Sequence, residues 1–275
     1  MRAAERTLAE DLAEMRDAAR HAGHIALSYA RAGDAKAWDK SPGHPVTEAD
    51  LAVNTYLADR LRKFRPEYGW LSEETADQPS ERRKTRTWVV DPIDGTRAFM
   101  RGDPHWCIGL AVVEEGISVA AVLYAPVFDE LFEARLSGGA YLNGIAMRTS
   151  ERSAEAGSRL IVNQTLIDHP DWPAPWPEVV VSDPKPNATL YRLALVASGA
   201  WDATFVLFRK SDWDLAAGAL LVEEAGGRVT THIGEALQFN KAVPAQRSLL
   251  AAGKALHPLL MRRMNRLELP DPNAS

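Results

Sequence analysis

The stretch WVVDPIDGTRAF, residues 88–99, is an apolar strand-like run that ends in two aspartates, Asp91 and Asp94. Pro92 forces a turn after the run, so both carboxylates can converge on one point beyond the end of the strand. Two carboxylates about 4 Å apart repel each other by about 4 kcal/mol at an effective dielectric constant of about 20, so such a cluster needs cations or protons to persist. Because the stretch contains no His or Cys, its oxygen ligands favour a hard ion, Mg²⁺ before Zn²⁺.

The composition is that of an ordinary globular protein. The 275 residues, 46% hydrophobic and 25% charged, allow one large α/β domain or two packed lobes. A net charge of −5, with no basic block longer than Arg82-Arg83-Lys84, argues against a binder of duplex nucleic acid. Cys107 is the only cysteine, which excludes an intrachain disulfide and a Cys-rich zinc site. We therefore expect a protein of the reducing cytoplasm.

No segment of the sequence predicts a membrane span or a signal peptide. The beginning of the chain, MRAAERTLAEDLAEM, is charged throughout. The longest apolar stretch, residues 106–127, is interrupted by Glu114-Glu115-Gly116 and is typical of a hairpin. We expect no membrane association.

The spacing of apolar residues predicts an α/β protein with mixed sheets, because the central hairpins require antiparallel pairing. Helical periodicity predicts helices at 5–31 with a break near Gly23, 47–64, 190–198, 213–225 and 254–267. Short apolar runs predict strands at 68–74, 87–91, 106–113, 117–124, 130–134, 178–183, 203–208, 228–231 and 248–252. The proline-rich segment 172–187 suggests a boundary between an N-terminal α+β lobe, 1–182, with the large antiparallel sheet and the metal motifs, and a C-terminal α/β lobe, 183–275.

Acidic side chains stand at three separate element ends. Glu73-Glu74 closes the run before the quoted stretch, and Asp214 opens a helix near residue 213. The ends of strands and helices are where α/β folds place their sites. Asp-Pro and Asp-Gly are also common turn dipeptides, so the central motif alone would more often indicate a turn.

Two other acidic motifs are weaker explanations. Phosphatases with an aspartyl-phosphate intermediate carry Asp-x-Asp-Gly-Thr, whereas the spacing here is one residue longer, which displaces the second acid to another side of the turn. An EF-hand requires ligands at alternating positions and a glutamate at the twelfth, and both are missing.

The ordered motifs together resemble the inositol monophosphatase superfamily. They are Glu73-Glu74, Asp91-Pro92-Ile93-Asp94-Gly95-Thr96 and Trp213-Asp214-Leu215-Ala216-Ala217-Gly218. The similarity runs from Lys40 and Pro45-Val46-Thr47-x-x-Asp50 to Glu224-Ala225-Gly226-Gly227. It implies a layered α-β-α-β-α sandwich of the inositol monophosphatase/fructose bisphosphatase type.

The resemblance also implies a metal site. Two or three Mg²⁺ ions would be held by Glu73, Asp91, the carbonyl of Ile93, Asp94 and Asp214. Four carboxylates against two or three divalent cations leave the site neutral or positive, which suits a phosphate dianion. Glu74 is either a residue that supports the metal ligands or a solvated neighbour, with the latter slightly favoured, and Lys40 is either site-proximal or, more commonly for such a residue, a lone surface lysine.

The implied reaction is direct in-line hydrolysis of a phosphate monoester without a covalent intermediate. By resemblance, Thr96 and Asp50 polarise the water together with Glu73. Asp50 is also a helix-start acid, since it follows Thr47 by three residues in a spacing that resembles a capping box. Gly95 and Thr96 are expected to open a helical turn whose free amides meet the phosphate, with Asp214 as a further substrate contact.

Several substrates and one different class remain open. Leu71-Ser72-Glu73-Glu74 and Leu123-Tyr124-Ala125-Pro126-Val127 favour the bacterial 3'(2'),5'-bisphosphate nucleotidase branch. The alternatives are an inositol-1-monophosphatase and then a histidinol-phosphate phosphatase. Relatives have a Gly-Ser-rich segment where this chain has Pro186-Asn187-Ala188-Thr189.

A non-catalytic binding or regulatory protein on the same fold is the alternative of a different class. Every expected ligand type is present, which argues against it. The resemblance further implies lithium sensitivity, a small phosphorylated metabolite as partner, and a possible homodimer.

Overall fold

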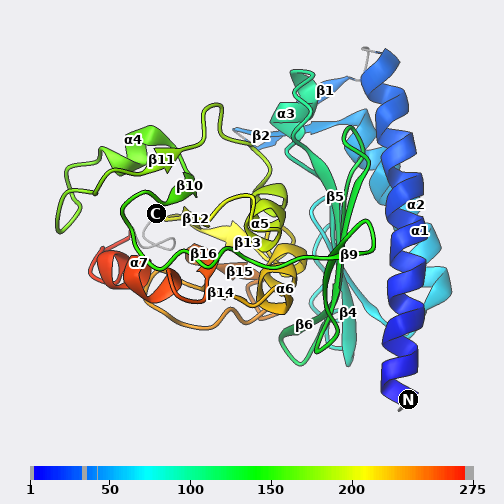
Figure 1. Cartoon of the computed structure of the whole chain (residues 1–275). Coiled ribbons are helices and arrows are strands. Elements are labelled where there is room, and N and C mark those ends of the chain that lie inside the picture. Colours follow the sequence, from blue (N-terminus) through cyan, green and yellow to red (C-terminus); the bar gives the residue numbers. More distant parts are fainter. Residues whose placement is uncertain (1–2, 33–35, 42, 270–275) are drawn as a thin grey trace.

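The computed structural model describes residues 3–32, 36–41 and 43–269. Its elements stack in alternating layers of helix and sheet (Figure 1). A helical pair covers one face of a seven-stranded sheet, a second helical pair lies between that sheet and a five-stranded sheet, and a final helix covers the far side. This is the layered α-β-α-β-α arrangement with mixed sheets that the sequence predicts.

The helices of the described residues are α1 (Ala3–Ala32), α2 (Glu48–Phe64), α3 (Thr96–Met100), α4 (Gln164–Ile167), α5 (Thr189–Ala197), α6 (Ala216–Glu224) and α7 (His257–Met264). The first pair is α1 and α2, the second is α5 and α6, and α7 lies on the outer face of the smaller sheet.

The seven-stranded sheet has the order β3-β4-β5-β6-β7-β8-β9, with bounds Gly69–Ser72, Arg86–Asp94, Cys107–Glu114, Ile117–Ala125, Glu130–Arg135, Gly139–Leu142 and Ile145–Ala146. The five-stranded sheet has the order β11-β10-β12-β16-β14, with bounds Val180–Val181, Arg159–Ile161, Ala203–Val206, Leu249–Gly253 and Gly227–Thr230. Two short hairpin-like pairs are β1 (Ala37–Ser41) with β2 (His44–Thr47), and β13 (Lys210–Ser211) with β15 (Ala245–Gln246). In the large sheet only the β3–β4 pair is parallel, within the described residues.

Both faces of the large sheet are buried, which explains why its strands are continuous apolar runs. Along β4, Trp88 and Val90 point into a core shared with α1 and α2, whereas Val89 points into the core shared with α5 and α6. Each large apolar side chain removed from water in this way stabilises the fold by about 1.5–3 kcal/mol. The two cores thus clamp the end of β4, which carries the aspartates, between four helices.

Helix α1 is continuous, so the predicted break near Gly23 is wrong. A β-carbon built on Gly23 would lie 2.6 Å from a ring carbon of Tyr124 on β6 and 2.9 Å from the side chain of Pro126. The glycine therefore provides space for the close approach of α1 to the sheet rather than an interruption of the helix.

The division into two lobes stays a prediction. Strands β10 and β11 lie before residue 182, yet they pair with β12 in the smaller sheet. By sheet membership we propose that the boundary lies between Ala146, the last residue of β9, and Arg159, the first residue of β10.

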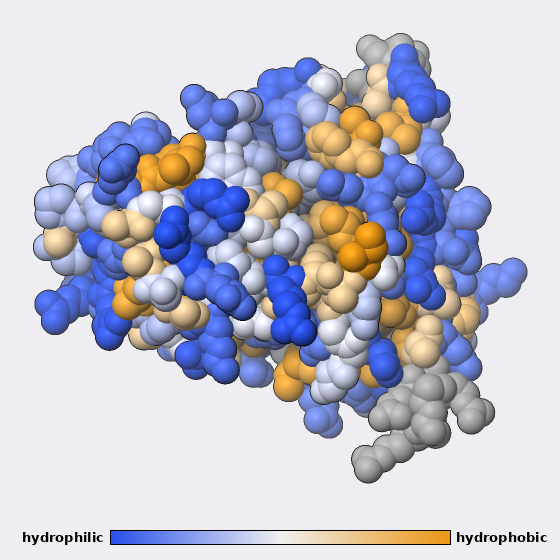
Figure 2. Space-filling model, in the orientation of Figure 1, coloured by the Kyte–Doolittle hydropathy of each residue, from blue (hydrophilic) through white to orange (hydrophobic). Residues whose placement is uncertain are grey.

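The surface in Figure 2 is predominantly hydrophilic, with hydrophobic side chains in scattered groups. Exposed apolar side chains include Ile145 on β9, which is 75% exposed. Scattered exposure of this kind is normal for a folded protein. In the described part of the chain, no helix combines the length and the apolar character that crossing a membrane requires.

Replacement of Gly23 by alanine tests the close approach of α1 to the sheet. Helix propensity alone favours alanine by about 1 kcal/mol. The clash with Tyr124 has the opposite sign and a typical size of about 1–3 kcal/mol. We expect Gly23→Ala to lower the free energy of unfolding in urea, by about 1 kcal/mol. Ser28→Ala, at an exposed position of the same helix, should leave it unchanged or raise it; a stabilised Gly23→Ala variant would contradict the packing argument.

Candidate metal centre and phosphate site

The acidic residues meet at one edge of the large sheet because β3 and β4 run parallel, so their carboxyl ends lie together. Glu73 follows the last residue of β3. On β4, Asp91 pairs with Gly109 and Asp94 with Cys107, and the register shifts between them. This irregularity lets both aspartates turn toward the same side instead of alternating across the sheet.

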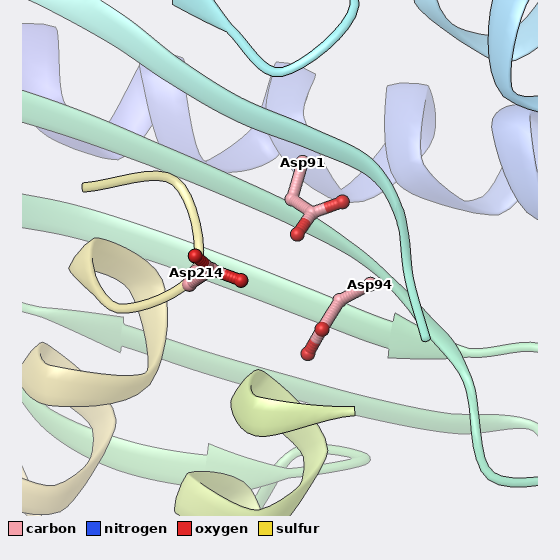
Figure 3. Close-up of side chains that lie close together, drawn as sticks. All are labelled: Asp91, Asp94 and Asp214. Carbon is pink, nitrogen blue, oxygen red and sulfur yellow. The ribbon is translucent and has the colours of Figure 1, made fainter. Parts of the chain in front are cut away.

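Asp214 completes a cluster with Asp91 and Asp94 (Figure 3). It belongs to the segment just before α6, more than a hundred positions away in sequence. One carboxylate oxygen from each of the three residues lies within 4.8 Å of the other two. The structure therefore brings together three of the four carboxylates that the sequence predicts to be metal ligands.

Asp91 is the most unusual member of the cluster. It is 1% exposed, and neither of its carboxylate oxygens has a hydrogen-bond partner among the described residues. Burial raises its pKa well above the ordinary value, and the negative charges of Glu73, Asp94 and Asp214 raise it further. An unpaired buried carboxylate is costly, so this arrangement requires a proton or a cation.

Asp94 is also buried, but it is partly satisfied. The backbone N–H of Leu190, in the first turn of α5, donates a hydrogen bond to its Oδ2. Burial and the nearby charge of Asp214 raise the pKa of Asp94 to about 7, although Lys210 and this backbone hydrogen bond act in the opposite direction. The start of α5 thus faces the cluster with free amides, where negative charge is favoured.

The donor set fits a hard divalent cation. The cluster offers carboxylate oxygens only, and the two oxygens of Asp91 lack any competing partner in the described residues. Oxygen donors of this kind suit Mg²⁺, Ca²⁺ or Mn²⁺.

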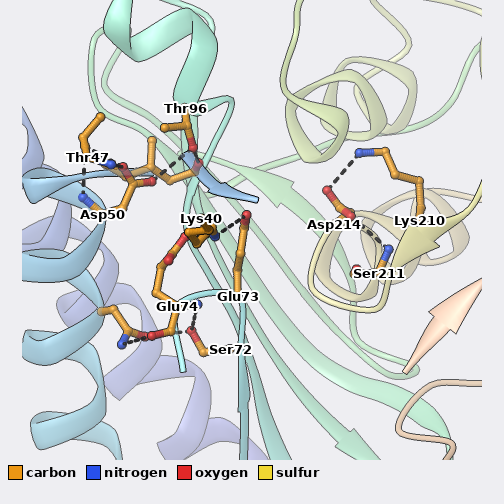
Figure 4. Close-up of polar contacts among 12 residues, drawn as sticks. Lys40, Thr47, Asp50, Ser72, Glu73, Glu74, Thr96, Lys210, Ser211 and Asp214 are labelled. Carbon is orange, nitrogen blue, oxygen red and sulfur yellow. Dashed lines mark hydrogen bonds and ion pairs between the residues drawn. The ribbon is translucent and has the colours of Figure 1, made fainter. Parts of the chain in front are cut away.

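Glu73 stands next to this cluster and is bonded to Lys40 (Figure 4). The Lys40 amino group lies 3.1 Å from Glu73 Oε1 and also pairs with Glu74. Burial raises the pKa of Glu73, an effect opposed by Lys40 and increased by Asp214. Within the described residues the three-carboxylate group does not include Glu73.

Two interpretations from the sequence are wrong here. Glu74 is not a solvated neighbour, because its side chain is 2% exposed and is bonded to Lys40. Lys40 is not a lone surface lysine, since the β1–β2 hairpin holds it over both glutamates. The hairpin is short and exposed, with no apolar alternation in β1, so its pairing left no signal in the sequence.

Thr47, Asp50 and Thr96 form a hydrogen-bonded chain beside the acids (Figure 4). Thr47 caps α2 in the predicted capping box, and its N–H donates to Asp50 Oδ2 at 2.9 Å. The Thr96 hydroxyl lies 3.1 Å from Asp50 Oδ1 and 3.2 Å from the carbonyl oxygen of Ile93, so its single proton can go to either one. Burial raises the pKa of Asp50 to about 6. Asp50 is therefore both a helix-start acid and a partner of Thr96.

Gly95 and Thr96 open α3 as the sequence predicts. Gly95 is the residue before the helix and has φ of +98°, a conformation that strongly favours glycine. Ala188 and the carbonyl of His105 approach it closely, so a side chain has little room there. The predicted site residues thus lie around one edge of the sheet.

Two contributions to the site had no clear signal in the sequence. Lys210 bonds to Asp214 at 3.0 Å, and the N–H of Ser211 fixes the other oxygen of Asp214, also at 3.0 Å. Gly109 lets α5 reach the cluster, because a β-carbon there would lie 2.2 Å from a methyl group of Leu190. The four-residue spacing between Lys210 and Asp214 is the single feature of the sequence that could have indicated their contact.

The layered fold and the buried carboxylate cluster define a class of protein, the metal-dependent hydrolases of phosphate esters. The family model described as the inositol monophosphatase family matches residues 8–269. The chain belongs to this family, whose members are metal-dependent phosphoric monoester hydrolases in which use of magnesium and sensitivity to lithium are typical.

Individual relatives agree with this assignment. The inositol-1-monophosphatase of Caulobacter vibrioides is 31% identical over 91% of this chain and 99% of its own length. A protein of Xylella fastidiosa named Nus factor SuhB is 32% identical over 88% of this chain and 90% of its own length. The crystal structure of extragenic suppressor protein suhB from Bartonella henselae superimposes with a TM-score of 0.79 at 28% identity, covering 94% of this chain and 99% of that one.

The buried acids predict how the stability of the metal-free protein depends on pH. A carboxyl group whose pKa is raised by folding, as that of Asp94 is from 3.8 to about 7, binds its proton more tightly in the folded state. The protonated carboxyl group stabilises the fold fully below its unfolded-state pKa of 3.8. This stabilisation is lost as the pH rises through its folded-state pKa of about 7. In EDTA, we expect the free energy of unfolding to fall between pH 4.5 and 8 less steeply for Asp94→Asn than for the parent, by about 1–3 kcal/mol over that range.

Asp202→Asn is the matched control for this measurement. Although burial opposes the shift, hydrogen bonds from Arg159 hold the pKa of Asp202 below its usual value, so its loss should lower stability without changing the slope in this window. Equal slopes for the parent and Asp94→Asn would contradict the charge repulsion described for the cluster.

Proposed function

We propose that this protein hydrolyses a small phosphate monoester with the help of divalent cations, Mg²⁺ in the first place. One observation carries the proposal: Asp91 is buried with both oxygens unpaired among the described residues, within reach of Asp94 and Asp214. A purely structural role would leave this repulsion without compensation. Bound cations would compensate the repulsion between these carboxylates and so stabilise the cluster.

The residues proposed to hold two or three ions are Glu73, Asp91, Ile93 through its carbonyl, Asp94 and Asp214. When bound, the cations supply positive charge that polarises a phosphoryl group and the water that attacks it. The field of Glu73 on Asp91, second only to burial in raising the pKa of Asp91, supports including Glu73 in this set.

Thr96 and Asp50 are proposed to take up the proton of the attacking water, together with Glu73. The Thr96 hydroxyl can donate to Asp50 Oδ1 and leave its own oxygen free to accept from water. Asp50 is kept in place by the N–H and hydroxyl of Thr47. A pKa of about 6 for Asp50, raised mainly by burial, suits a group that gains and loses a proton near neutral pH.

The phosphate group is proposed to meet the start of α3, with Asp214 as a further substrate contact. Gly95 stands before α3 in a left-handed conformation and no side chain caps this helix, so we assign the phosphate contact to the amides of Gly95 and Thr96. Glycine also lets the backbone approach a phosphate oxygen closely.

For the substrate, we propose a 3'(2'),5'-bisphosphate nucleotide first. The motifs Leu71-Ser72-Glu73-Glu74 and Leu123-Tyr124-Ala125-Pro126-Val127 support it. Inositol 1-phosphate is the second candidate, supported by the name of the Caulobacter relative. Histidinol phosphate is the third. We further propose action in the cytoplasm as a homodimer, by resemblance and from the single, buried cysteine.

A regulatory protein without turnover is the competing function of a different class. The observation in its favour is the relative named Nus factor SuhB, with 32% identity. The two readings differ in one measurable quantity, the metal-dependent release of phosphate. Release that is lost in EDTA supports the enzyme, and no release from the three candidate substrates would favour the regulatory protein.

Asp91→Asn tests the metal assignment. The substitution removes one charge from the cluster and relieves repulsion, so the metal-free protein should stay folded and melt at the same or a higher temperature. Phosphate release with Mg²⁺ should fall at least about a hundredfold. Asp17→Asn, at an exposed position of α1, should match the parent in both measurements. Near-normal turnover in Asp91→Asn would show that the assignment is wrong.

Thr96→Val tests the proton path. Valine keeps the shape of threonine but removes the hydroxyl that bonds to Asp50. We expect kcat to fall by about 10²–10⁴-fold while the melting temperature changes little. Thr96→Ser should recover most of the rate, because it restores the hydroxyl. Equal rates for the valine and serine variants would exclude a role for this oxygen.

A further inference from the structure

A group of positive charges lies next to the acidic cluster and is not used by the proposed metal chemistry. Its members are Lys185, Arg192 and Lys210, from the segment before α5, from α5 itself and from β13. Leu190, two residues before Arg192 on α5, donates its N–H to Asp94, and Lys210 bonds to Asp214, whose carboxylate lies within 4.8 Å of that of Asp94. The charges of Arg192 and Lys210 both act on Lys185, and Asp94 acts on it with the opposite sign. The three side chains therefore share one neighbourhood at the edge of the phosphate site.

Arg192 is buried without a full set of partners. It is 5% exposed, and its Nη2 donates to the Thr189 hydroxyl at 3.0 Å. Its Nε has no hydrogen-bond partner, and no carboxylate lies within 4.0 Å of its guanidinium, among the described residues. Burial lowers its pKa in spite of the attraction of Asp94 and Asp214, so these acids do not fully compensate its charge. A buried guanidinium rarely keeps an N–H donor without a hydrogen-bond partner unless the protein binds an anion at that point.

Lys185 is in a similar state. Its only hydrogen bond within the described part of the chain is to the carbonyl of Pro186, at 3.4 Å, and it forms no ion pair there. Burial lowers its pKa to about 8, and the charges of Arg192 and Lys210 act in the same direction. Lys210 alone has an acidic partner, Asp214, which connects the group to the proposed metal site.

The grouping is unfavourable as it stands and becomes favourable with an anion. Like charges in a partly buried setting repel, and a phosphate offers several acceptor oxygens for lysine and arginine donors. The segment that carries Lys185 leads into Pro186-Asn187-Ala188-Thr189, and Ala188 lies against Gly95 at the start of α3. Lys185 is therefore three residues from a direct contact with the proposed phosphate site.

We propose that Lys185, Arg192 and Lys210 form a subsite for a second anionic group of the substrate, a phosphate that is not hydrolysed. The proposal rests on the phosphatase function proposed above and specifies its substrate class as a bisphosphate. The polyol part of inositol 1-phosphate is neutral, so it gains nothing from this subsite. Histidinol phosphate, which carries a positively charged amine, is repelled by it.

Matched pairs of substrates isolate the subsite. 3'-Phosphoadenosine 5'-phosphate and adenosine 3'-phosphate share the reacting group and differ in the 5'-phosphate, and fructose 1,6-bisphosphate with fructose 1-phosphate form a second pair. With Mg²⁺ present, we expect kcat/KM for the bisphosphate to exceed that for the monophosphate by at least about tenfold in one pair. The pair that shows the preference identifies the rest of the substrate as a nucleoside or a sugar.

Lys185→Met should bring the ratio of the two kcat/KM values close to one. Arg192→Met should do the same, and Arg192→Lys should keep part of the preference because it retains the charge. Lys63→Met is the control, since Lys63 is exposed in the last turn of α2, about 20 Å from Asp50 in the first turn. Melting temperatures separate loss of binding from unfolding for both variants, because Arg192 is buried and Lys185 is partly buried.

The outcomes separate the two proposals. Metal-dependent hydrolysis without a preference for either bisphosphate, or with a preference that Lys185→Met leaves intact, overturns the subsite alone. If no member of the two pairs, nor inositol 1-phosphate, nor histidinol phosphate is hydrolysed in a metal-dependent way, the proposed function is overturned, and the subsite with it.

Discussion

The constraint on which the rest of the structure depends is the burial of like charges at the edge of one sheet. Asp91, Asp94 and Asp214 present oxygens within 4.8 Å of one another, and Asp91 has no hydrogen-bond donor among the described residues. In an isolated strand and helix these groups would separate into water. They stay together because two cores clamp β4 between helical layers, so that apolar burial on both faces opposes the repulsion.

Small residues make this clamp tight enough to bring distant elements to the acids. Gly109 lets Leu190 of α5 approach the sheet, and the N–H of Leu190 then donates to Asp94. Gly218 lets α6 pack closely on Leu193 of α5, since a β-carbon there would lie 2.5 Å from a leucine methyl group. Both helices that serve the site are thus positioned by the absence of a side chain. The same glycines therefore allow both the close packing of α5 and α6 and the contact of α5 with Asp94.

Opposite charges are arranged side by side around this edge. On one side, Lys40 is shared between Glu73 and Glu74. On the other, Lys185 and Arg192 stand without acidic partners among the described residues, while the acids next to them carry raised pKa values. Buried acids and buried basic side chains that are not paired with each other cost free energy, and they suit a ligand that combines cations with phosphate groups. A phosphorylated substrate with a second anionic group would compensate both sides together.

The sequence by itself determined the class of fold, the bounds of most elements and the acids of the site, because apolar periodicity and acidic residues at element ends are local signals. The capping box at Thr47 and the helix start at Gly95 were equally readable. Contacts between distant segments were not: the bond of Lys40 to the two glutamates depends on an exposed hairpin, and the role of Gly23 depends on Tyr124. Only the tertiary structure decided these, and the grouping of Lys185 with Arg192, because electrostatic and packing partners are set by distance in space and leave no period in the chain.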